Sequence, residues 1–297
     1  MEKKFKSGFA AIIGLPNVGK STLLNALAGQ KIAIVSDKPQ TTRNKILAIF
    51  NDKNHQIIFT DTPGIHKPHN KLGEFMVKTA TDTINDVDIV IFMVDAQRKI
   101  SQTEREIAKS IQKSGADCIL AINKADAAKK EELLPVIADY SNLNNFSAIV
   151  PISAKTGDGV DILLDELKKL LPEGPKFYDD EELITDQQEK GIAEEIIREK
   201  ILRFLDKEVP HGIAVQIEKM SELDRITKIY ASIYCEKASH KGIIIGKNGE
   251  MLKKIGKYAR CDIEKMLDKK VYLELWVKVR NDWRNSEKTI RSFGFDA

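Results

Sequence analysis

The sequence lacks the features of secreted, zinc-bound and membrane-spanning proteins. It has only three cysteines, Cys118, Cys235 and Cys261, and no C-x-x-C pair that could hold zinc or begin a disulfide framework. No apolar run approaches the length of a bilayer-spanning helix. The start, Met-Glu-Lys-Lys-Phe-Lys, leads into an apolar stretch without a signal-type cleavage site. We therefore expect a protein of the reducing cytoplasm.

The charge is distributed unevenly along the chain. With 297 residues, 42% of them hydrophobic and 31% charged, two ordinary globular domains are expected. Residues 1–236 contain 32 Lys and Arg against 36 Asp and Glu, whereas residues 237–291 contain 15 against 7. Because concentrated positive charge attracts phosphate groups, this basic segment is a candidate for binding nucleic acid or an anionic membrane surface. A plain solvated surface is the alternative.

Short apolar runs rich in β-branched residues alternate with longer amphipathic stretches in the first half of the chain. This alternation predicts an α/β fold in which a doubly wound, mostly parallel sheet is covered on both faces by helices. An amphipathic helix over 161–167 closes the domain. The predicted strands are 10–13, 56–59, 89–94, 118–122 and 148–152.

The second half of the chain predicts a separate α+β domain. Two prolines and a glycine in 171–175 end the preceding helix, and an acidic stretch after them is typical of an exposed linker. The order of predicted elements beyond the linker is α-β-β-α-α-β. They comprise a helix over 192–205, strands at 213–218 and 226–234, a glycine-rich turn at 242–249, a helix over 251–267 and a strand over 271–279. The predicted domain limits are 1–174, 175–190 for the linker, and 191–297.

The segment Gly14-x-x-x-x-Gly19-Lys20-Ser21 lies between a predicted strand and a predicted helix, which is the context of a phosphate-binding P-loop. Glycines let successive backbone N–H groups point inward, and the helix N-terminus adds positive potential. In this motif Lys20 reaches the β- and γ-phosphates, and the Ser21 hydroxyl binds magnesium. The motif predicts a nucleoside triphosphate held together with Mg²⁺.

Three further motifs follow predicted strands in the order that a GTP site requires. Asp61-Thr-Pro-Gly64 places a carboxylate where it can hold the water shell of magnesium. Asn123-Lys-Ala-Asp126 ends in a carboxylate that can accept two N–H bonds from guanine, which adenine could not supply. Ser153-Ala-Lys155 would close the base pocket with a backbone N–H. Each peptide alone would be an ordinary turn or loop, whereas together they predict GTP rather than ATP.

With these motifs the chain resembles the translation-factor-like GTPases, in which a switch threonine joins magnesium when the γ-phosphate is present. The resemblance points to Pro39-Gln-Thr-Thr-Arg43, between the first helix and the second strand. Thr42 is favoured over Thr41, although sequence alone does not separate two adjacent hydroxyls, and such a pair is more often a turn or a cap than a ligand. The expected magnesium ligands are therefore Ser21, Thr42 and Asp61.

The usual water-positioning side chain is absent. Many small GTPases have glutamine directly after Asp-x-x-Gly, but Ile65 occupies that position and can neither donate nor accept a hydrogen bond. The sequence resembles GTPases with such a hydrophobic replacement, in which the asparagine corresponding to Asn17 helps to hold a potassium ion beside the phosphates. Such an ion would supply the charge of an arginine finger. We therefore expect slow, potassium-stimulated hydrolysis, with a structural capping role for Asn17 as the alternative.

The basic segment contains the sequence Gly242-Ile-Ile-Ile-Gly246-Lys-Asn-Gly249. It includes the G-x-x-G that joins two helices and clamps a short run of nucleotide backbone in KH domains. A bare G-x-x-G is a weak signal, but here the α-β-β-α-α-β order and the surrounding lysines accompany it. Lys247 would supply charge, and residues 243–245 would form an apolar floor for unstacked bases. The motif predicts binding of single-stranded RNA.

The order of elements is that of a type II KH domain, and the closing strand 271–280 followed by Asp282-Trp-Arg284 resembles the Era family of GTPases. This resemblance covers nearly the whole chain. It implies a task in assembly of the 30S ribosomal subunit, with the KH domain holding the 3′ end of 16S ribosomal RNA. We also expect a cytoplasmic monomer that does not bind DNA. A further hypothesis is that the basic segment is a patch that binds peripherally to the anionic inner membrane surface, and this role can coexist with RNA binding. An RNA-binding scaffold with structural guanine nucleotide and little hydrolysis is the alternative.

The expected functional residues form three sets. The catalytic set is Asn17, Lys20, Thr42, Asp61 and Gly64. The GTP-binding set is Gly14, Leu15, Pro16, Asn17, Val18, Gly19, Lys20, Ser21, Thr22, Asp61, Thr62, Pro63, Gly64, Ile65, Asn123, Lys124, Ala125, Asp126, Ser153, Ala154 and Lys155. The RNA-binding set is Lys241, Gly242, Ile243, Ile244, Ile245, Gly246, Lys247, Asn248, Gly249 and Lys253.

Overall fold

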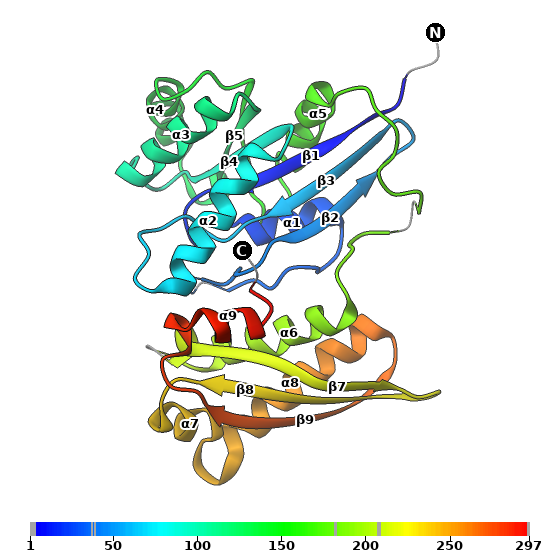
Figure 1. The fold of residues 1–297 in the computed structure, drawn as a ribbon. Helices are drawn as coiled ribbons and strands as arrows, with labels where there is room; N and C mark the ends of the chain where they lie inside the picture. Colours follow the sequence, from blue (N-terminus) through cyan, green and yellow to red (C-terminus); the bar gives the residue numbers. More distant parts are fainter. Residues whose placement is uncertain (1–3, 37, 39, 181–182, 207–208, 296–297) are drawn as a thin grey trace. The chain divides into compact units, whose positions relative to one another are not determined.

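The chain forms two compact units (Figure 1). The structure, a computed structural model, describes residues 4–36, 38, 40–180, 183–206 and 209–295, except for the side chains of residues 130 and 132. The first unit comprises Met1–Ala33, Thr42–Pro68 and Gly73–Asp186, and the second comprises Ile34–Thr41, His69–Leu72 and Gln187–Ala297. Two short segments of the N-terminal half therefore group with the C-terminal part. The domain limits at residues 174 and 191 stay a prediction.

A six-stranded sheet forms the centre of the first unit. Its strand order is β2-β3-β1-β4-β5-β6, and all neighbouring strands are parallel except the antiparallel pair β2 and β3. The predicted α/β class is confirmed, although the edge strand β2 was not among the predicted runs. The strands are β1 (Lys6–Ile13), β2 (Ile46–Asn51), β3 (His55–Asp61), β4 (Ile89–Asp95), β5 (Asp117–Asn123) and β6 (Ala148–Pro151).

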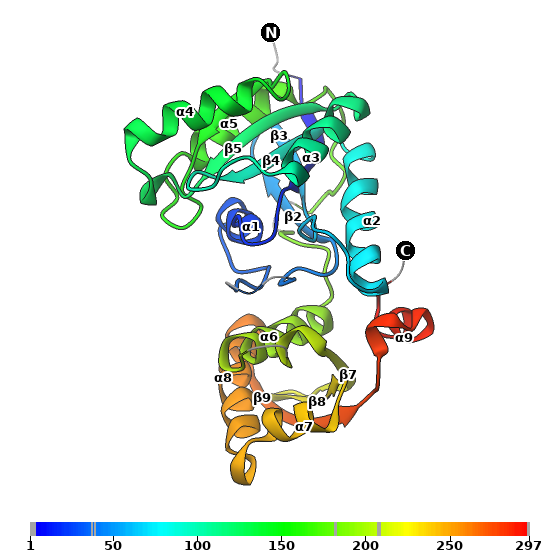
Figure 2. The same ribbon diagram turned by 90° about the vertical axis from the view of Figure 1, so that its left-hand side faces the viewer.

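Helices pack on both faces of this sheet (Figures 1 and 2). Leu23 and Leu27 of α1 and Leu163 and Leu167 of α5 enter one core, while α2, α3 and α4 contribute to the core on the opposite face. Each fully buried leucine stabilises the fold by about 1.5–3 kcal/mol. The helices are α1 (Lys20–Ala28), α2 (Lys71–Asn85), α3 (Gln102–Ser114), α4 (Lys130–Ser141) and α5 (Val160–Leu170), with a 3-10 turn η1 (Ala125–Ala127) after β5.

The parallel strands bring four predicted motifs to one edge of the sheet. β1 ends at Ile13, directly before its motif, whereas β3 and β5 end at Asp61 and Asn123, which are the first residues of their motifs. Because the carboxyl ends of parallel strands meet at the same edge, the loops after β1, β3, β5 and β6 face a common space. Topology alone therefore gathers residues from four distant parts of the sequence.

The second unit is a three-stranded sheet with helices. Its strand order is β7-β8-β9, with β7 and β8 antiparallel and β8 and β9 parallel, so the predicted α-β-β-α-α-β order is confirmed. Within the described ranges, no helix is long and apolar enough to cross a bilayer. The elements are α6 (Glu189–Phe204), η2 (Val209–Gly212), β7 (Ile213–Glu222), β8 (Ile226–Cys235), α7 (Ala238–Ile245), η3 (Lys247–Gly249), α8 (Glu250–Leu267), β9 (Lys270–Val279), η4 (Trp283–Asn285) and α9 (Glu287–Ser292).

The glycine-rich turn predicted over 242–249 is wrong in its first half. Residues Ala238–Ile245 form helix α7, so Gly242 lies inside a helix and the turn begins at Gly246. Ile244 has no exposed surface and packs in the same core as Ile255 and Ile263 of α8. Burial of this isoleucine extends the helix past Gly242, because packing overrides the low helix propensity of glycine.

Aromatic side chains fasten the segment after β9 to this unit. Trp283 has no exposed surface, and its Nε1 donates a hydrogen bond of 2.9 Å to the Gly212 carbonyl. The Trp283 ring lies edge-on to Phe293 with centroids 5.2 Å apart, and stacks on Phe295 at 6.3 Å. Phe293 also contacts Tyr234 of β8, with centroids 4.8 Å apart. This cluster covers part of the sheet face opposite the α8 core.

The two tryptophans provide a matched stability test. Trp283→Ala should destabilise the second unit by about 3–5 kcal/mol, because it removes a buried ring and leaves the Gly212 carbonyl without its donor. Trp276 is 41% exposed, so Trp276→Ala should cost less than about 1 kcal/mol. Hydrogen exchange of the β7–β9 amides in increasing urea measures both losses. Equal losses in the two variants would contradict the structural role of Trp283.

Candidate functional site

Glycines allow the loop after β1 to pass close to neighbouring strands. A side chain at Gly14 would place its Cβ 2.3 Å from the Met93 carbonyl oxygen. Gly19 has φ of 104°, and a Cβ there would lie 2.3 Å from Asn123 Nδ2. Helix α1 begins at the next residue with no acidic residue in its first turn. Its N-terminal N–H groups and dipole therefore offer positive potential to an anion.

Lys20 lies in the centre of this loop. It is 6% exposed, and its ammonium group donates hydrogen bonds to the carbonyls of Gly14 at 3.2 Å and Leu15 at 3.0 Å. Burial lowers the pKa of Lys20 to about 8, although the nearby Asp61 carboxylate acts in the opposite direction. A buried ammonium of this kind gains free energy from any further negative charge, so the site favours phosphate groups.

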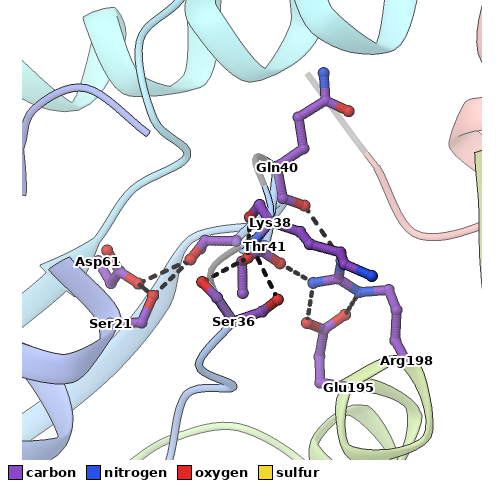
Figure 3. A network of polar contacts seen from close by, with 9 residues as sticks. Ser21, Ser36, Lys38, Gln40, Thr41, Asp61, Glu195 and Arg198 are labelled. Atoms are coloured by element: carbon purple, nitrogen blue, oxygen red, sulfur yellow. Dashed lines mark hydrogen bonds and ion pairs between the residues drawn. The ribbon is translucent and has the colours of Figure 1, made fainter. Parts of the chain in front are cut away.

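Three oxygen-bearing side chains meet beside the loop (Figure 3). The Ser21 hydroxyl lies 2.8 Å from the Thr42 hydroxyl and donates to Asp61 Oδ2 at 2.7 Å, and Thr42 donates to the same oxygen at 3.1 Å. Thr41 points elsewhere, because its hydroxyl donates to the Lys38 carbonyl at 2.6 Å. Of the two adjacent threonines, Thr42 therefore joins this oxygen cluster.

The oxygen cluster fits a magnesium ion. Asp61 has no exposed surface, burial raises the pKa of its carboxyl group, and Lys20, Ser21 and Thr42 act in the opposite direction. Its Oδ1 atom is buried without a hydrogen-bond partner among the described residues. A carboxylate and two hydroxyls suit a hard cation such as Mg²⁺, which also keeps several waters. Within the same residues, no group of three or more His, Cys, Asp or Glu side chains could hold a metal ion.

Hydrogen bonds and close backbone contacts place the Asp61-Thr-Pro-Gly64 segment against the phosphate loop. Thr62 Oγ1 donates to the Ile12 carbonyl at 3.0 Å, and the Ile65 N–H donates to the Gly14 carbonyl at 3.2 Å. A Cβ at Gly64 would lie 2.7 Å from the backbone nitrogen of Pro16. The Ile65 side chain packs against the core on one face of the sheet, so this position offers no polar side chain to a water molecule.

The other predicted residues of the loop lie in the same region. Asn17 has φ of 64°, which is unusual for a residue other than glycine and belongs to the tight turn of the loop. Val18 is fully buried in the core. The remaining residues of the predicted GTP-binding set in this region are partly or fully buried. They are Leu15, Pro16, Thr22 and Pro63.

Asn123 joins the phosphate loop to the predicted base pocket. Its Nδ2 donates to the Val18 carbonyl at 2.7 Å, and its Oδ1 accepts from the Ala154 N–H at 2.9 Å. The Ala125 N–H donates to the Ile152 carbonyl at 3.0 Å. Asp126 lies in η1 and is exposed, so its carboxylate is accessible to a ligand.

Sequence reasoning missed Asp95. It is 3% exposed, and its Oδ2 lies 2.7 Å from the Lys124 ammonium and 3.4 Å from Arg98 Nε. Lys124 adopts φ of 64°, and this ion pair holds its side chain beside the pocket. The signal that could have identified Asp95 is its position at the end of β4, where it pairs in register with Asn123 of β5.

In the second unit, the turn between α7 and α8 exposes its polar residues. Gly246 and Gly249 have φ of 73° and 77°, and a Cβ at Gly246 would lie 2.7 Å from Met251 Cβ. Lys247 and Asn248 between them are exposed. The exposed neighbours on α7 and α8 are Lys241, Gly242, Ile243, Lys253, Lys254 and Lys257. A backbone-accessible turn within this basic surface suits a phosphate chain.

The residues predicted to form an apolar floor differ in exposure. Ile243 is 50% exposed, Ile245 is partly buried, and Ile244 is fully buried. Only Ile243 and Ile245 can therefore reach the surface, while Ile244 supports the turn from the core.

Comparison with known proteins gives the family. One family model, described as a 50S ribosome-binding GTPase, matches residues 9–124, and another, described as a KH domain, matches residues 208–284. GTPase Era of Ruminiclostridium cellulolyticum is 52% identical over 292 residues, which cover 98% of each chain. GTPase Era of Alkaliphilus oremlandii is 54% identical over 294 residues, covering 98% of this chain and 99% of the relative. The chain belongs to the Era family of GTPases.

Solved Era structures share the fold over the full length. An Era variant from Aquifex aeolicus bound to GDP and AlF4⁻ is 40% identical with a TM-score of 0.95, covering 99% of this chain and all of the other. Era in complex with MgGDPNP and nucleotides 1506–1542 of 16S ribosomal RNA is 41% identical, with the same TM-score and coverage. The resemblance to the Era family and the predicted fold are confirmed.

The lowered pKa of Lys20 predicts how nucleotide binding depends on pH. Above about pH 8 the nucleotide-free protein loses the ammonium charge that faces the phosphates. Bound phosphates raise the lysine pKa, so binding takes up a proton and weakens as the pH rises, by roughly fourfold between about pH 7 and 8.5. Titration of the nucleotide-free protein with fluorescent GDP measures this. Residual binding by Lys20→Arg should be independent of pH, and a constant wild-type affinity would refute the assignment.

Proposed function

We propose that this Era-family protein is a GTP-hydrolysing switch that binds single-stranded 16S ribosomal RNA near its 3′ end and assists assembly of the 30S subunit. The observation that carries this proposal is the oxygen cluster of Ser21, Thr42 and Asp61 beside the ammonium group of Lys20. It lies where the carboxyl ends of β1 and β3 meet, next to the N-terminus of α1. Such a cluster suits a triphosphate and Mg²⁺ together.

Different residues of the first unit would bind different parts of the nucleotide. The backbone N–H groups of the loop from Gly14 to Ser21 and the Lys20 ammonium would bind the phosphates. The Asp126 carboxylate would accept the two N–H groups of guanine. Ser21, Thr42 and Asp61 would hold Mg²⁺, which neutralises charge on the phosphates when it is bound. Thr42 belongs to a loop, so its hydroxyl can join the site with GTP and leave after hydrolysis.

We infer that the side chain of the residue after Gly64 takes no part in positioning the attacking water. Ile65 is held by its backbone N–H and packs against the core. We propose that Asn17, in its left-handed turn, helps to hold a potassium ion that supplies positive charge to the phosphates. The same Ile65 favours the second candidate function, an RNA-binding scaffold in which guanine nucleotide is structural and seldom hydrolysed.

The proposed RNA site is the turn from Gly246 to Gly249 with the lysines around it. The left-handed glycines bring the backbone to the surface, and Lys247 and Asn248 are exposed there. Era bound to nucleotides 1506–1542 of 16S ribosomal RNA, at 41% identity, supports the same ligand for this chain. We propose the 30S subunit as the natural partner, and the anionic membrane surface as a weaker, electrostatic one.

Turnover in different salts tests the hydrolysis proposal. Phosphate release under multiple turnover should be roughly tenfold faster in potassium than in sodium buffer, because one added positive charge stabilises the transition state. Asn17→Ala should abolish this difference. Equal rates in the two salts would refute the potassium site, and failure to turn over in either salt would favour the scaffold.

A charge reversal in the turn tests the RNA site. Lys247→Glu should weaken binding of an oligonucleotide with the 16S 3′ sequence roughly tenfold and lower the salt dependence, because a phosphate contact is lost. Lys265→Glu makes the same charge change at an exposed position in the last turn of α8 and should have little effect. Fluorescence polarisation measures both. Equal weakening would indicate only general electrostatic attraction.

Crosslinking of the GTP-bound protein followed by RNA sequencing identifies the target. Enrichment of the 16S 3′ end is expected. Enrichment elsewhere would overturn the proposed RNA target and leave the GTPase assignment intact.

A further inference from the structure

Aromatic side chains line part of the open face of the β7–β8–β9 sheet in the second unit. Successive side chains of a strand point to opposite faces, and Ile229 of β8 belongs to the core that α6 and α8 share. Tyr230, the next residue, therefore faces the other way. Across the parallel strands (Figure 1), Tyr230 pairs with Glu274 of β9. Tyr272 and Trp276, two positions to either side of this glutamate, lie on the same open face.

The three rings of Tyr230, Tyr272 and Trp276 form one group, which we call the aromatic platform. Tyr230 and Trp276 stack with centroids 5.9 Å apart and ring planes inclined by 15°. Tyr272 meets Tyr230 edge-on, with centroids 6.0 Å apart. The Tyr272 hydroxyl donates a hydrogen bond of 3.0 Å to Glu274, which restrains its ring. The platform is therefore ordered by its own contacts, so a ligand need not order it.

The platform is accessible although its rings are apolar. Tyr272 is 46% exposed and Trp276 is 41% exposed, while Tyr230 is half-buried. Neighbouring exposed rings are more informative than scattered ones, because contiguous apolar surface marks contact sites. In the three strands, which the structure describes throughout, no aliphatic side chain is exposed on this face. The surface therefore suits a flat aromatic ligand better than an aliphatic side chain or a lipid chain.

Lysines flank the platform on the same face. Across the strand pairs, Lys219 of β7 lies opposite Tyr230, and Lys228 of β8 lies opposite Tyr272. Lys270 begins β9, two positions before Tyr272, and so shares its face. All three lysines are exposed. A chain of phosphates that follows the platform would therefore meet positive charge along its length.

The acidic side chains of this face are already engaged. Glu218 accepts hydrogen bonds from Lys278 Nζ at 2.9 Å and from the Tyr234 hydroxyl at 3.2 Å, and the bond from Lys278 lowers the pKa of Glu218. Glu274 accepts the bond from Tyr272. Since Lys278 balances Glu218, the three lysines that flank the platform leave this part of the face positive.

We propose that this sheet face is a second contact surface for single-stranded RNA. Unstacked bases extend the stack at Trp276 and Tyr272, and the flanking lysines bind the phosphates of the same stretch. Bases paired within a duplex have no free face to offer, so the surface selects single strands. It shares no residue with the turn from Gly246 to Gly249. It rests on the proposed function only in that this domain binds RNA.

Affinity for an oligonucleotide tests the platform. Trp276→Ala should weaken binding of a labelled oligonucleotide of about twelve nucleotides with the 16S 3′ sequence about tenfold, because one base loses its stacking partner. Trp276→Phe keeps a ring and should lose less than about threefold. Fluorescence polarisation measures both. Hydrogen exchange of the β7–β9 amides in the same preparations checks that the sheet is intact.

A matched control removes an exposed ring elsewhere. Phe177 is 51% exposed and belongs to the first unit, so Phe177→Ala should leave the RNA affinity unchanged. Equal weakening by Phe177→Ala and Trp276→Ala, or wild-type affinity in Trp276→Ala, would overturn the platform.

Tryptophan fluorescence reports the contact directly. The chain has two tryptophans, and Trp283 has no exposed surface, so a base can stack only on Trp276. RNA should therefore quench the emission of wild type, and Trp276→Phe should remove the quenching. RNA binding by wild type without any quenching would refute stacking at this position.

A double variant separates the platform from the turn. If the two surfaces hold different parts of one RNA, the losses in Lys247→Glu and Trp276→Ala should multiply, to about a hundredfold. A double variant no weaker than Lys247→Glu alone would mean that Trp276 acts through the turn, and the second surface would fall.

The wild-type protein distinguishes failure of this inference from failure of the proposed function. If wild type does not bind the oligonucleotide, the proposed RNA binding fails. If wild type binds it and only Lys247→Glu weakens the complex, the turn stands and the platform fails. Weaker binding of Trp276→Ala to phosphatidylglycerol vesicles, with RNA affinity unchanged, would assign this face to the membrane instead.

Discussion

Two opposite charges buried at the carboxyl edge of the sheet constrain the structure around them. Lys20 is 6% exposed and Asp61 has no exposed surface, and burial lowers the pKa of the lysine and raises that of the aspartate. Neither charge is favourable there alone, and their mutual attraction offsets only part of the cost of desolvation. Loop carbonyls stabilise the ammonium group, and the hydroxyls of Ser21 and Thr42 stabilise the carboxylate. The shape of the phosphate loop and the position of Thr42 both follow from this pair.

Much of the nucleotide site could be predicted because its motifs are local in sequence. Each motif follows a strand, and parallel strands bring their ends to one edge whatever the length of the connecting helices. The close approach at Gly14 and Gly64 is likewise a property of glycine that the sequence displays. The roles assigned to these residues stay predictions, but the structure brings the loops from Gly14, Asp61 and Asn123 together.

The remaining features depend on contacts between distant residues. Strand β2 was missed although residues 46–50 form a continuous apolar run, and its antiparallel pairing with β3 at the sheet edge comes only from the structure. The second half of α7 was missed because Gly242 suggests a turn, and only the burial of Ile244 against α8 shows otherwise.

The two hydrogen bonds of Asn123 have a consequence for how the ligand is bound. One side chain holds the Val18 carbonyl of the phosphate loop and the Ala154 N–H of the base loop. A nucleotide that orders either loop therefore lowers the entropy cost of ordering the other. Base and phosphates should bind as a chelate, so that an intact guanine nucleotide binds more tightly than its separate halves would suggest.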